Sequence, residues 1–173
     1  MSTTLRGRVW KFGDDLSGDD GIIEFSVVRE QFGKLDENVL KDMCFRKVRP
    51  EFPATVRTGD IVVGGRNFAH HNHVEVSAAI KYSGIAAVIC ESCETGFMRK
   101  ALNFGLPVVL CPGISGIVND GEQIEVDPVS GQVIAGGGSL AAQPFSERMV
   151  AVWKAGGLVP LLKKTAEARR LSA

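Results

Sequence analysis

The sequence has few of the features that would assign it to a specialised class of protein. Basic residues number 20 and acidic residues number 20, so no excess charge favours nucleic acid or an anionic membrane as a partner. No apolar run is long enough for a signal peptide or a transmembrane helix, which predicts a cytoplasmic protein. Four cysteines are too few for a secreted disulfide framework. Aromatic residues make up only 7%, whereas glycine occurs 20 times, which indicates many turns and close backbone approaches.

Histidine is also scarce, and its distribution is uneven. The chain contains three, His70, His71 and His73, and all of them lie in the segment NFAHHNHVEV at 67–76. Three interpretations compete: a metal site, an acid/base site, and a solvated loop whose side chains cap the following helix. Zinc would need a third or fourth ligand, which only Glu75 could supply nearby. Capping is the simplest interpretation of the pattern alone, and acid/base chemistry is open because histidine titrates near neutral pH.

The hydrophobic pattern predicts an α/β fold with a partly parallel sheet. Continuous apolar runs of strand length occur at 61–63, 85–90 and 106–111, and helical patterns at 73–84 and 92–105 separate them. The two consecutive βα units imply parallel strands joined by right-handed crossovers. Runs without polar alternation are typical of strands that are covered on both faces.

The N-terminal part is less regular. An imperfect alternation predicts a strand at 5–13, an acidic loop follows at 14–21, and the stretch at 22–28 is short and β-branched. Asp36 is placed to cap a short helix, and Ser92 is placed to cap the helix at 92–105.

The C-terminal part predicts a hairpin and a helical tail. Apolar and polar residues alternate at 121–137 around an Asp-Pro-Val-Ser-Gly turn. Two helices follow at about 144–170, separated by Gly156 and Gly157, with Ser146 as the cap of the first. We expect a single domain over residues 1–173, to which these helices are appended.

The histidine segment occupies a favourable position in the predicted fold. It follows a buried parallel strand and precedes a helix, where ligands bind in open α/β sheets and where helix N-termini attract anions. Gly64 and Gly65 permit close backbone approach, and Arg66 and Asn67 are candidate ligand contacts. The pattern therefore predicts a carboxylate or phosphate site, although it lacks the spacing of a phosphate loop.

Motifs spread over nearly the whole chain resemble those of one enzyme family. The matching stretches are KFGDDLSGDDGII (11–23), TGDIVVGGRNF (58–68), AAIKYSGIAAVICES (78–92), FMRKALNFGLPVVLCP (97–112), DGEQIEVDPVSGQV (120–133) and AGGLVPLLKK (155–164). Their order and spacing resemble the 3-isopropylmalate dehydratase small subunit, the swivel domain of the aconitase superfamily. The first stretch carries about one inserted residue.

This resemblance implies a swivelling β/β/α domain that closes over a large iron–sulfur subunit. In the family that partner carries a [4Fe–4S] cluster, one iron of which acts as a Lewis acid on the substrate hydroxyl. The implied activity is that of a hydro-lyase that moves a hydroxyl group between neighbouring carbons of a hydroxy di- or tricarboxylic acid. The cysteines here lack a Cys-x2-Cys-x2-Cys run, so we expect no cluster in this chain. The sequence names neither the substrate nor a homo-oligomeric state of the isolated chain.

The resemblance breaks at the histidine segment. There the family has Gly-Ser-Ser-Arg-Glu, in which a serine removes the α-proton and the arginine binds a substrate carboxylate. Alignment from AAIK backwards places His71 and Asn72 at the serines and His73 at the arginine, with one deletion. These three residues are therefore the predicted catalytic set. We hypothesise that imidazole replaces the family's serine base.

Further substrate-facing residues are implied by the resemblance. Asp20, or Asp19 beside it, matches an acidic residue near the family site, and Arg29 is the nearest substitute for a missing arginine of the early substrate loop. The predicted substrate-binding set is Asp20, Arg29, Arg66, Asn67 and His70, and no residue is predicted as a metal ligand. Two alternatives remain open: a non-catalytic carboxylate-binding swivel module, and a metal-dependent enzyme that uses the histidines directly.

Overall fold

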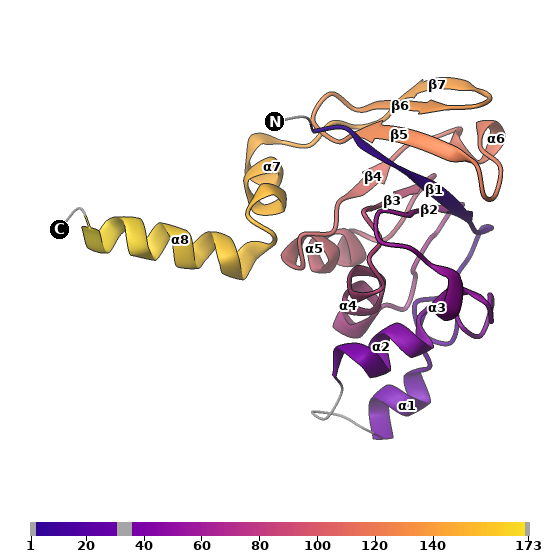
Figure 1. Cartoon of the computed structure of the whole chain (residues 1–173), viewed down its shortest axis with the longest axis horizontal. Helices are drawn as coiled ribbons and strands as arrows, with labels where there is room; N and C mark the ends of the chain where they lie inside the picture. The colour runs from indigo at the N-terminus through magenta and orange to yellow at the C-terminus, as the bar shows by residue number, and fades with distance from the viewer. Residues whose placement is uncertain (1–2, 31–35, 172–173) are drawn as a thin grey trace.

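A mixed sheet forms the centre of the molecule (Figure 1). The computed structural model describes residues 3–30 and 36–171. In these residues the sheet has the strand order β4-β3-β2-β1-β5-β6-β7. The strands are β1 (Leu5–Lys11), β2 (Ile61–Gly64), β3 (Ala87–Cys90), β4 (Val108–Leu110), β5 (Gln123–Asp127), β6 (Gln132–Ala135) and β7 (Gly138–Ala141). Strands β1 to β4 are mutually parallel, and β5 to β7 continue the sheet in antiparallel fashion.

The helices precede, connect and follow these strands. They are α1 (Phe25–Glu30), α2 (Glu37–Met43), α3 (Phe52–Thr55), α4 (Val74–Tyr82), α5 (Thr95–Asn103), α6 (Ile114–Ile117), α7 (Glu147–Lys154) and α8 (Leu158–Leu171). In Figure 1, α1 to α5 lie on one side of the parallel strands, and α8 projects away from the body. Helix α4 packs between α2 and α5.

Two apolar clusters hold the sheet between its covering layers. The larger cluster joins the parallel strands to the helices and contains Phe45, Phe52 and Phe68. The smaller cluster lies on the other face and contains Ile89 and Val133. All residues of β2 and β3 are buried, which confirms the prediction of strands covered on both faces. Burial on both sides of the sheet is the main source of stability for such strands.

Several local predictions are confirmed. Asp36 accepts hydrogen bonds from the backbone of the first turn of α2, and Ser146 accepts one from Met149 at the start of α7. Helices α4 and α5 end just before Gly84 and Gly105, which have φ angles of 86° and 69°. Glycine adopts these left-handed angles without steric cost, so it terminates both helices.

Other local expectations need correction. The β-branched stretch at 22–28, to which the sequence assigned no element, contributes Phe25 to Val28 to α1. Ser92 does not cap α5; its hydroxyl accepts a hydrogen bond from the backbone of Asn67, and Glu94 precedes the helix. The hairpin is extended by β7, and α3 and α6 are single turns that no periodicity announces.

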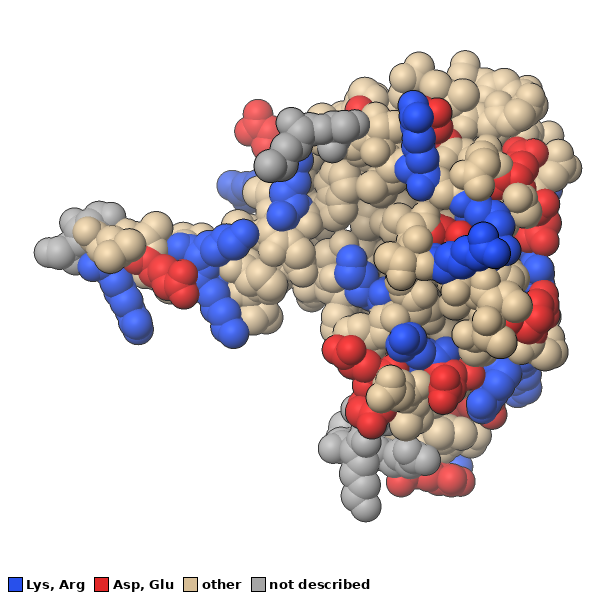
Figure 2. Space-filling model, viewed as in Figure 1, with Lys and Arg blue, Asp and Glu red and all other residues tan. Residues whose placement is uncertain are grey.

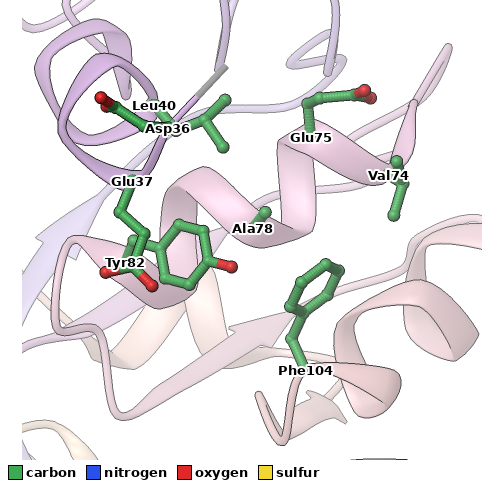
Figure 3. Close-up of a pocket in the computed structure, with 8 residues that line it drawn as sticks. All are labelled: Asp36, Glu37, Leu40, Val74, Glu75, Ala78, Tyr82 and Phe104. Atoms are coloured by element: carbon green, nitrogen blue, oxygen red, sulfur yellow. The ribbon is translucent and has the colours of Figure 1, made fainter. Parts of the chain in front are cut away.

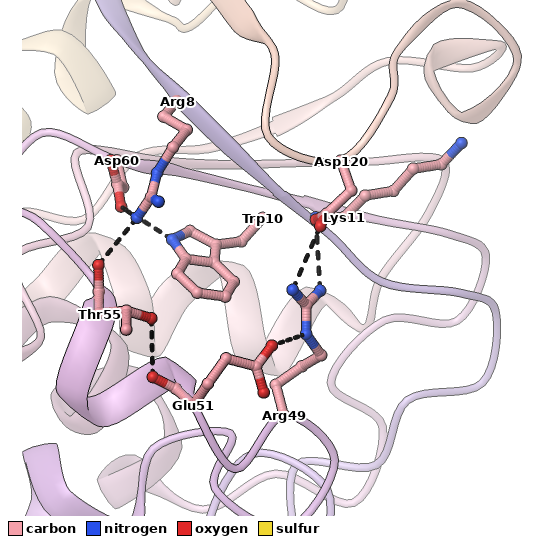
Figure 4. Close-up of polar contacts among 8 residues, drawn as sticks. All are labelled: Arg8, Trp10, Lys11, Arg49, Glu51, Thr55, Asp60 and Asp120. Carbon is pink, nitrogen blue, oxygen red and sulfur yellow. Dashed lines mark hydrogen bonds and ion pairs between the residues drawn. The ribbon is translucent and has the colours of Figure 1, made fainter.

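The buried carboxylate of Asp60 links β1 to the segment before β2 (Figure 4). Oδ2 of Asp60 accepts hydrogen bonds from Arg8 Nη2 at 2.7 Å, Trp10 Nε1 at 2.8 Å and the backbone N–H of Arg57 at 3.0 Å. The guanidinium groups of Arg8 and Arg49 lie 4.9 and 4.8 Å from the centroid of the Trp10 ring. A charge that is removed from water is stable only with such partners.

Candidate active site

Two loops pair along their backbones to form the candidate site. The histidine loop (65–73) connects β2 to α4, and the acidic loop (14–21) follows β1. Five backbone hydrogen bonds of 2.7–3.2 Å join the two segments: Gly65 N to Gly13 O, Asp15 N to Arg66 O, Ala69 N to Leu16 O, Gly18 N to His70 O, and Asp19 N to His71 O. Because these bonds alternate along both loops, the side chains of the two loops are held in a fixed register.

The glycine pair before the histidine loop permits this close approach. A Cβ on Gly65 would lie 2.2 Å from Asp14 Oδ1 and 2.7 Å from the carbonyl carbon of Gly13, and one on Gly64 would meet the Phe68 ring at 2.2 Å. The close approach that the sequence predicted for this glycine pair therefore brings Gly65 against the acidic loop and Gly64 against the buried ring of Phe68. No ligand is needed to explain it.

Replacement of Gly65 by alanine is expected to separate the two loops. The added methyl group has no space against Asp14 and Gly13, so catalytic turnover should fall at least tenfold while the far parts of the sheet stay folded. Gly96 in α5 is the matched control, because a Cβ there meets nothing within 4 Å. Steady-state kinetics and thermal melting of both variants check this. Equal turnover in the two variants would contradict the expected role of Gly65.

Arg66 and Asn67 are both occupied by the acidic loop. Arg66 donates from Nε and Nη2 to Asp14 Oδ2 at 3.0 and 2.8 Å, and its backbone N–H donates to Oδ1. The backbone and side-chain hydrogen bonds from Arg66 lower the pKa of the Asp14 carboxyl. Asn67 has a φ of 55° and donates its amide to Asp15 at 2.9 Å. In this arrangement both residues organise the turn.

His70 and His71 form a directed pair. Nε2 of His70 lies 3.0 Å from the carbonyl oxygen of Asp15, and the Nδ1 atoms of the two rings are 3.1 Å apart. A carbonyl oxygen can only accept, so His70 carries its proton on Nε2. When both rings are neutral, Nδ1 of His70 accepts the proton of His71 Nδ1. This arrangement leaves a lone pair on Nε2 of the exposed His71, which could act as a base.

His73 forms a second pair with a carboxylate. Its Nε2 lies 3.1 Å from Asp19 Oδ2, and its ring stacks on Phe25 with centroids 4.5 Å apart. Burial raises the pKa of Asp19, although the neighbouring His73 acts in the opposite direction, and Oδ1 of Asp19 is buried without a described partner. His73 precedes α4 at the cap position, yet its side chain makes no capping hydrogen bond. The capping interpretation therefore does not account for this side chain.

Asn72 is turned toward α5. Its Nδ2 donates to Glu94 Oε2 at 2.8 Å, and Lys100 Nζ donates to its side-chain and backbone oxygens at 2.8 and 2.7 Å. These contacts engage both ends of the amide and fix the direction of the loop between the two histidine pairs. The catalytic role that the sequence predicts for Asn72 stays a prediction.

A pocket of about 330 Å³ opens beside His73. Its wall is formed by Phe25 and Val28 of α1 together with Val74 and Glu75 of α4, and Arg29 and His73 supply a cation and an imidazole. The structure thus brings together two of the predicted site residues from segments 44 positions apart in the sequence. This pocket combines apolar surface with a group that can bind a carboxylate.

Asp20 lies apart from that pocket. It has a φ of 65°, and its Oδ1 accepts a hydrogen bond from Lys47 Nζ at 3.1 Å on the surface. Of the two neighbouring aspartates that the sequence offered, Asp19 is the one in contact with His73. Sequence reasoning missed Phe25, Glu94 and Lys100. No local pattern signals these residues, because each acts through a partner distant in the sequence.

Burial affects the reactivity of two cysteines. Burial raises the pKa of Cys44 to about 12 and that of Cys111 to about 11, which disfavours the reactive thiolates. Within 3–30 and 36–171, no group of three or more His, Cys, Asp or Glu side chains is arranged to hold a metal ion. No helix in the same residues is long and apolar enough to cross a membrane.

Three known proteins of similar sequence are all named as small subunits. No family model matches the chain. The 3-isopropylmalate dehydratase small subunit 1 of Methanopyrus kandleri is 37% identical over 169 residues, which cover 95% of each chain. The isopropylmalate/citramalate isomerase small subunit of Methanocaldococcus jannaschii is 38% identical over 95% of this chain and 96% of its own. The methanogen homoaconitase small subunit of Methanothermobacter thermautotrophicus is 37% identical, again over 95% of this chain.

A solved structure extends the similarity to the fold. The crystal structure of a 3-isopropylmalate dehydratase from Methanocaldococcus jannaschii superposes with a TM-score of 0.88, at 29% identity, over 98% of this chain and 99% of that one. Fold and relatives together define a subunit of a hydro-lyase-type enzyme. The chain belongs to the family of 3-isopropylmalate dehydratase small subunits.

Proposed function

We propose that this chain pairs with a large subunit and that the complex interconverts isomers of a hydroxy dicarboxylic or tricarboxylic acid. The relatives are named as small subunits of enzymes for isopropylmalate, citramalate and homoaconitate-type substrates, which supports a substrate with at least two carboxylates. The family resemblance implies a [4Fe–4S] cluster in the large subunit. The described residues of this chain contain no fitting ligand set, so the steps below involve only its own side chains.

One observation carries the proposed site: the His73–Asp19 pair lies at the wall of the pocket that Arg29 also lines. A carboxylate that accepts from Nε2 of His73 fixes the proton on that nitrogen and leaves Nδ1 as the basic atom. The same carboxylate stabilises the imidazolium that forms when Nδ1 takes a proton. Asp19 is therefore a positioning residue, and His73 is the proposed base.

The proton follows a reversible path in this proposal. In dehydration Nδ1 of His73 takes the proton from the carbon next to a carboxylate, while hydroxide leaves the neighbouring carbon for the Lewis acid that the large subunit would supply. In rehydration the imidazolium returns its proton to the carbon that lost the hydroxyl, and the hydroxide adds to the carbon that lost the proton. Arg29 holds one carboxylate of the substrate while the hydroxyl group leaves and returns. Nε2 of His71, in the same histidine loop, is a second acid/base candidate.

Reconstitution with the large subunit tests the function. The two subunits are co-expressed and purified without oxygen, and turnover is assayed with isopropylmalate, citramalate and homocitrate-type hydroxy acids. Turnover of at least one acid that requires both subunits is the expected result. Tight binding of a carboxylate by this chain with no turnover in any complex would instead identify a non-catalytic binding module.

Replacement of Arg29 by glutamine is expected to raise KM in that assay. Loss of a charge-assisted hydrogen bond to a carboxylate costs about 1.5–3 kcal/mol, which corresponds to roughly a tenfold to hundredfold increase. Arg99 on α5 is exposed away from this pocket, and Arg99→Gln is the matched control. A KM for Arg29→Gln within twofold of the control would contradict the carboxylate role of Arg29.

A further inference from the structure

Helix α8 forms an arm that leaves much of its apolar surface in solvent. It projects from the body in Figure 1, and its main contacts are with α7 and α5. Among the described residues, half of the large apolar side chains that are exposed belong to this helix: Leu158, Val159, Leu162 and Leu171. An isolated helix of 14 residues is marginal in water, so its amphipathic face needs a packing partner.

The direction of this arm is set by a backbone contact. Gly156 and Gly157 separate α7 from α8 with φ angles of 83° and 124°. A Cβ on Gly157 would lie 2.4 Å from the carbonyl oxygen of Asn103, and one on Gly105 would lie 2.6 Å from the carbonyl carbon of Gly156. The turn is thus seated tightly on the end of α5. The arm is therefore held away from most of its own body.

The charges of the arm select an acidic partner. Lys163, Lys164, Arg169 and Arg170 lie on α8, with Glu167 as the acidic exception, and Figure 2 shows this excess of basic side chains along the arm. At 100° per residue, Leu158, Val159 and Leu162 lie on one side of the helix, and Lys163 and Arg170 border them. Arg169 lies on the same side as these apolar residues, about two turns beyond Leu162, whereas Leu171 lies on the opposite side. Lys164 lies on the opposite side. Two such arms would repel each other if they paired directly.

The same chain offers a groove of the complementary kind. A groove of about 450 Å³ runs between α2 and α4 (Figure 3). Its apolar residues are Leu40, Val74, Ala78, Tyr82 and Phe104, and its charged residues are Asp36, Glu37 and Glu75. Among the described residues that line the groove there is no lysine, arginine or histidine, and no described cation pairs with Glu37 or Glu75.

We propose that two copies of this chain form a two-fold dimer in which the apolar face of each α8 lies in the α2–α4 groove of the other copy. The exchange satisfies both surfaces at once, because the apolar ridge covers the groove and Lys163 and Arg170 meet Glu37 and Glu75. A reciprocal contact also closes at two copies, whereas a single head-to-tail contact would continue into a filament. The groove shares Val74 and Glu75 with the pocket beside His73, so the dimer is a form of the chain without its large subunit and separates before that subunit closes over the pocket.

Charge-reversal substitutions on the two surfaces test the dimer. The untagged chain is studied by light scattering and sedimentation from about 1 to 100 µM, where a mass near twice the 18.6 kDa of one chain is expected. Lys163→Glu/Arg170→Glu and, separately, Glu37→Lys should each weaken the dimer at least tenfold. An equimolar mixture of these two variants should restore it, because each arm then meets a groove of opposite charge. Lys164→Glu and Asp42→Lys change the same helices away from the contact and should behave as wild type.

Two outcomes would overturn the proposal. One is a wild-type chain that stays monomeric at every concentration, including the case in which α8 variants impair only the assembly with the large subunit. The other is a dimer whose dissociation constant is unchanged in all variants. Mass measurements need no substrate, so these outcomes are independent of the proposed reaction.

Discussion

Replacement of His73 by asparagine is expected to lower kcat of the reconstituted enzyme by about 10²–10⁴-fold, the usual contribution of a positioned general base. Asparagine removes the imidazole and with it the stacking on Phe25, but it keeps a polar amide side chain beside Asp19, so the loop is expected to stay folded. KM should change much less than kcat, because substrate binding rests on Arg29. Steady-state kinetics with each accepted hydroxy acid separates the two parameters.

Two companion variants sharpen this result. Asp19→Asn removes the charge that stabilises the His73 imidazolium and should lower kcat by a smaller factor, with a changed pH profile. His71→Asn tests the other lone pair, on the ring that His70 orients. Wild-type kcat in both histidine variants would rule out imidazole as the replacement for the family's serine. Circular dichroism and melting confirm that each variant is folded.

Replacement of Asp60 by alanine is expected to destabilise the fold by about 3 kcal/mol, which is typical when one partner of a buried ion pair is removed. The side chain of Asp60 is 5% exposed, and it accepts from Arg8, Trp10 and the backbone of Arg57. Alanine leaves these donors without an acceptor. For a chain of this size the melting temperature should fall by roughly 10 °C. Asp42→Ala, on the exposed face of α2, is the control and should melt like wild type.

The effect of Asp60 should depend on pH in a defined direction. Burial raises the pKa of this carboxyl, but the hydrogen bonds from Arg8, Arg57 and Trp10 outweigh burial and hold the pKa below the ordinary value of 3.8. A carboxyl with a lowered native pKa stabilises the fold above its unfolded pKa and loses that contribution as the pH falls through the native value. The difference between Asp60→Ala and wild type should be complete at pH 7 and shrink below about pH 3.8. A difference that grows on acidification would contradict this assignment.

The frame of the molecule can be predicted from the amino-acid sequence alone. Continuous apolar runs at 61–63, 85–90 and 106–111 can be satisfied only by burial on both faces, and the helical patterns between them require parallel strands. Asp36 and Ser146 were recognisable as caps because the chemistry of capping is local. The motif order along the chain indicated the family, and the placement of all the histidines in one segment indicated where it departs.

The contacts between side chains of the candidate site could be read only from the folded chain. Asp19 and Asp20 are the same residue type in adjacent positions, yet the left-handed backbone at Asp20 directs it to Lys47, while Asp19 reaches His73. Arg66 was a plausible ligand contact until the pairing of the two loops supplied it with Asp14. These outcomes depend on contacts between segments distant in the sequence. Hydrophobic periodicity records only whether a residue is buried, and does not record which partner it faces.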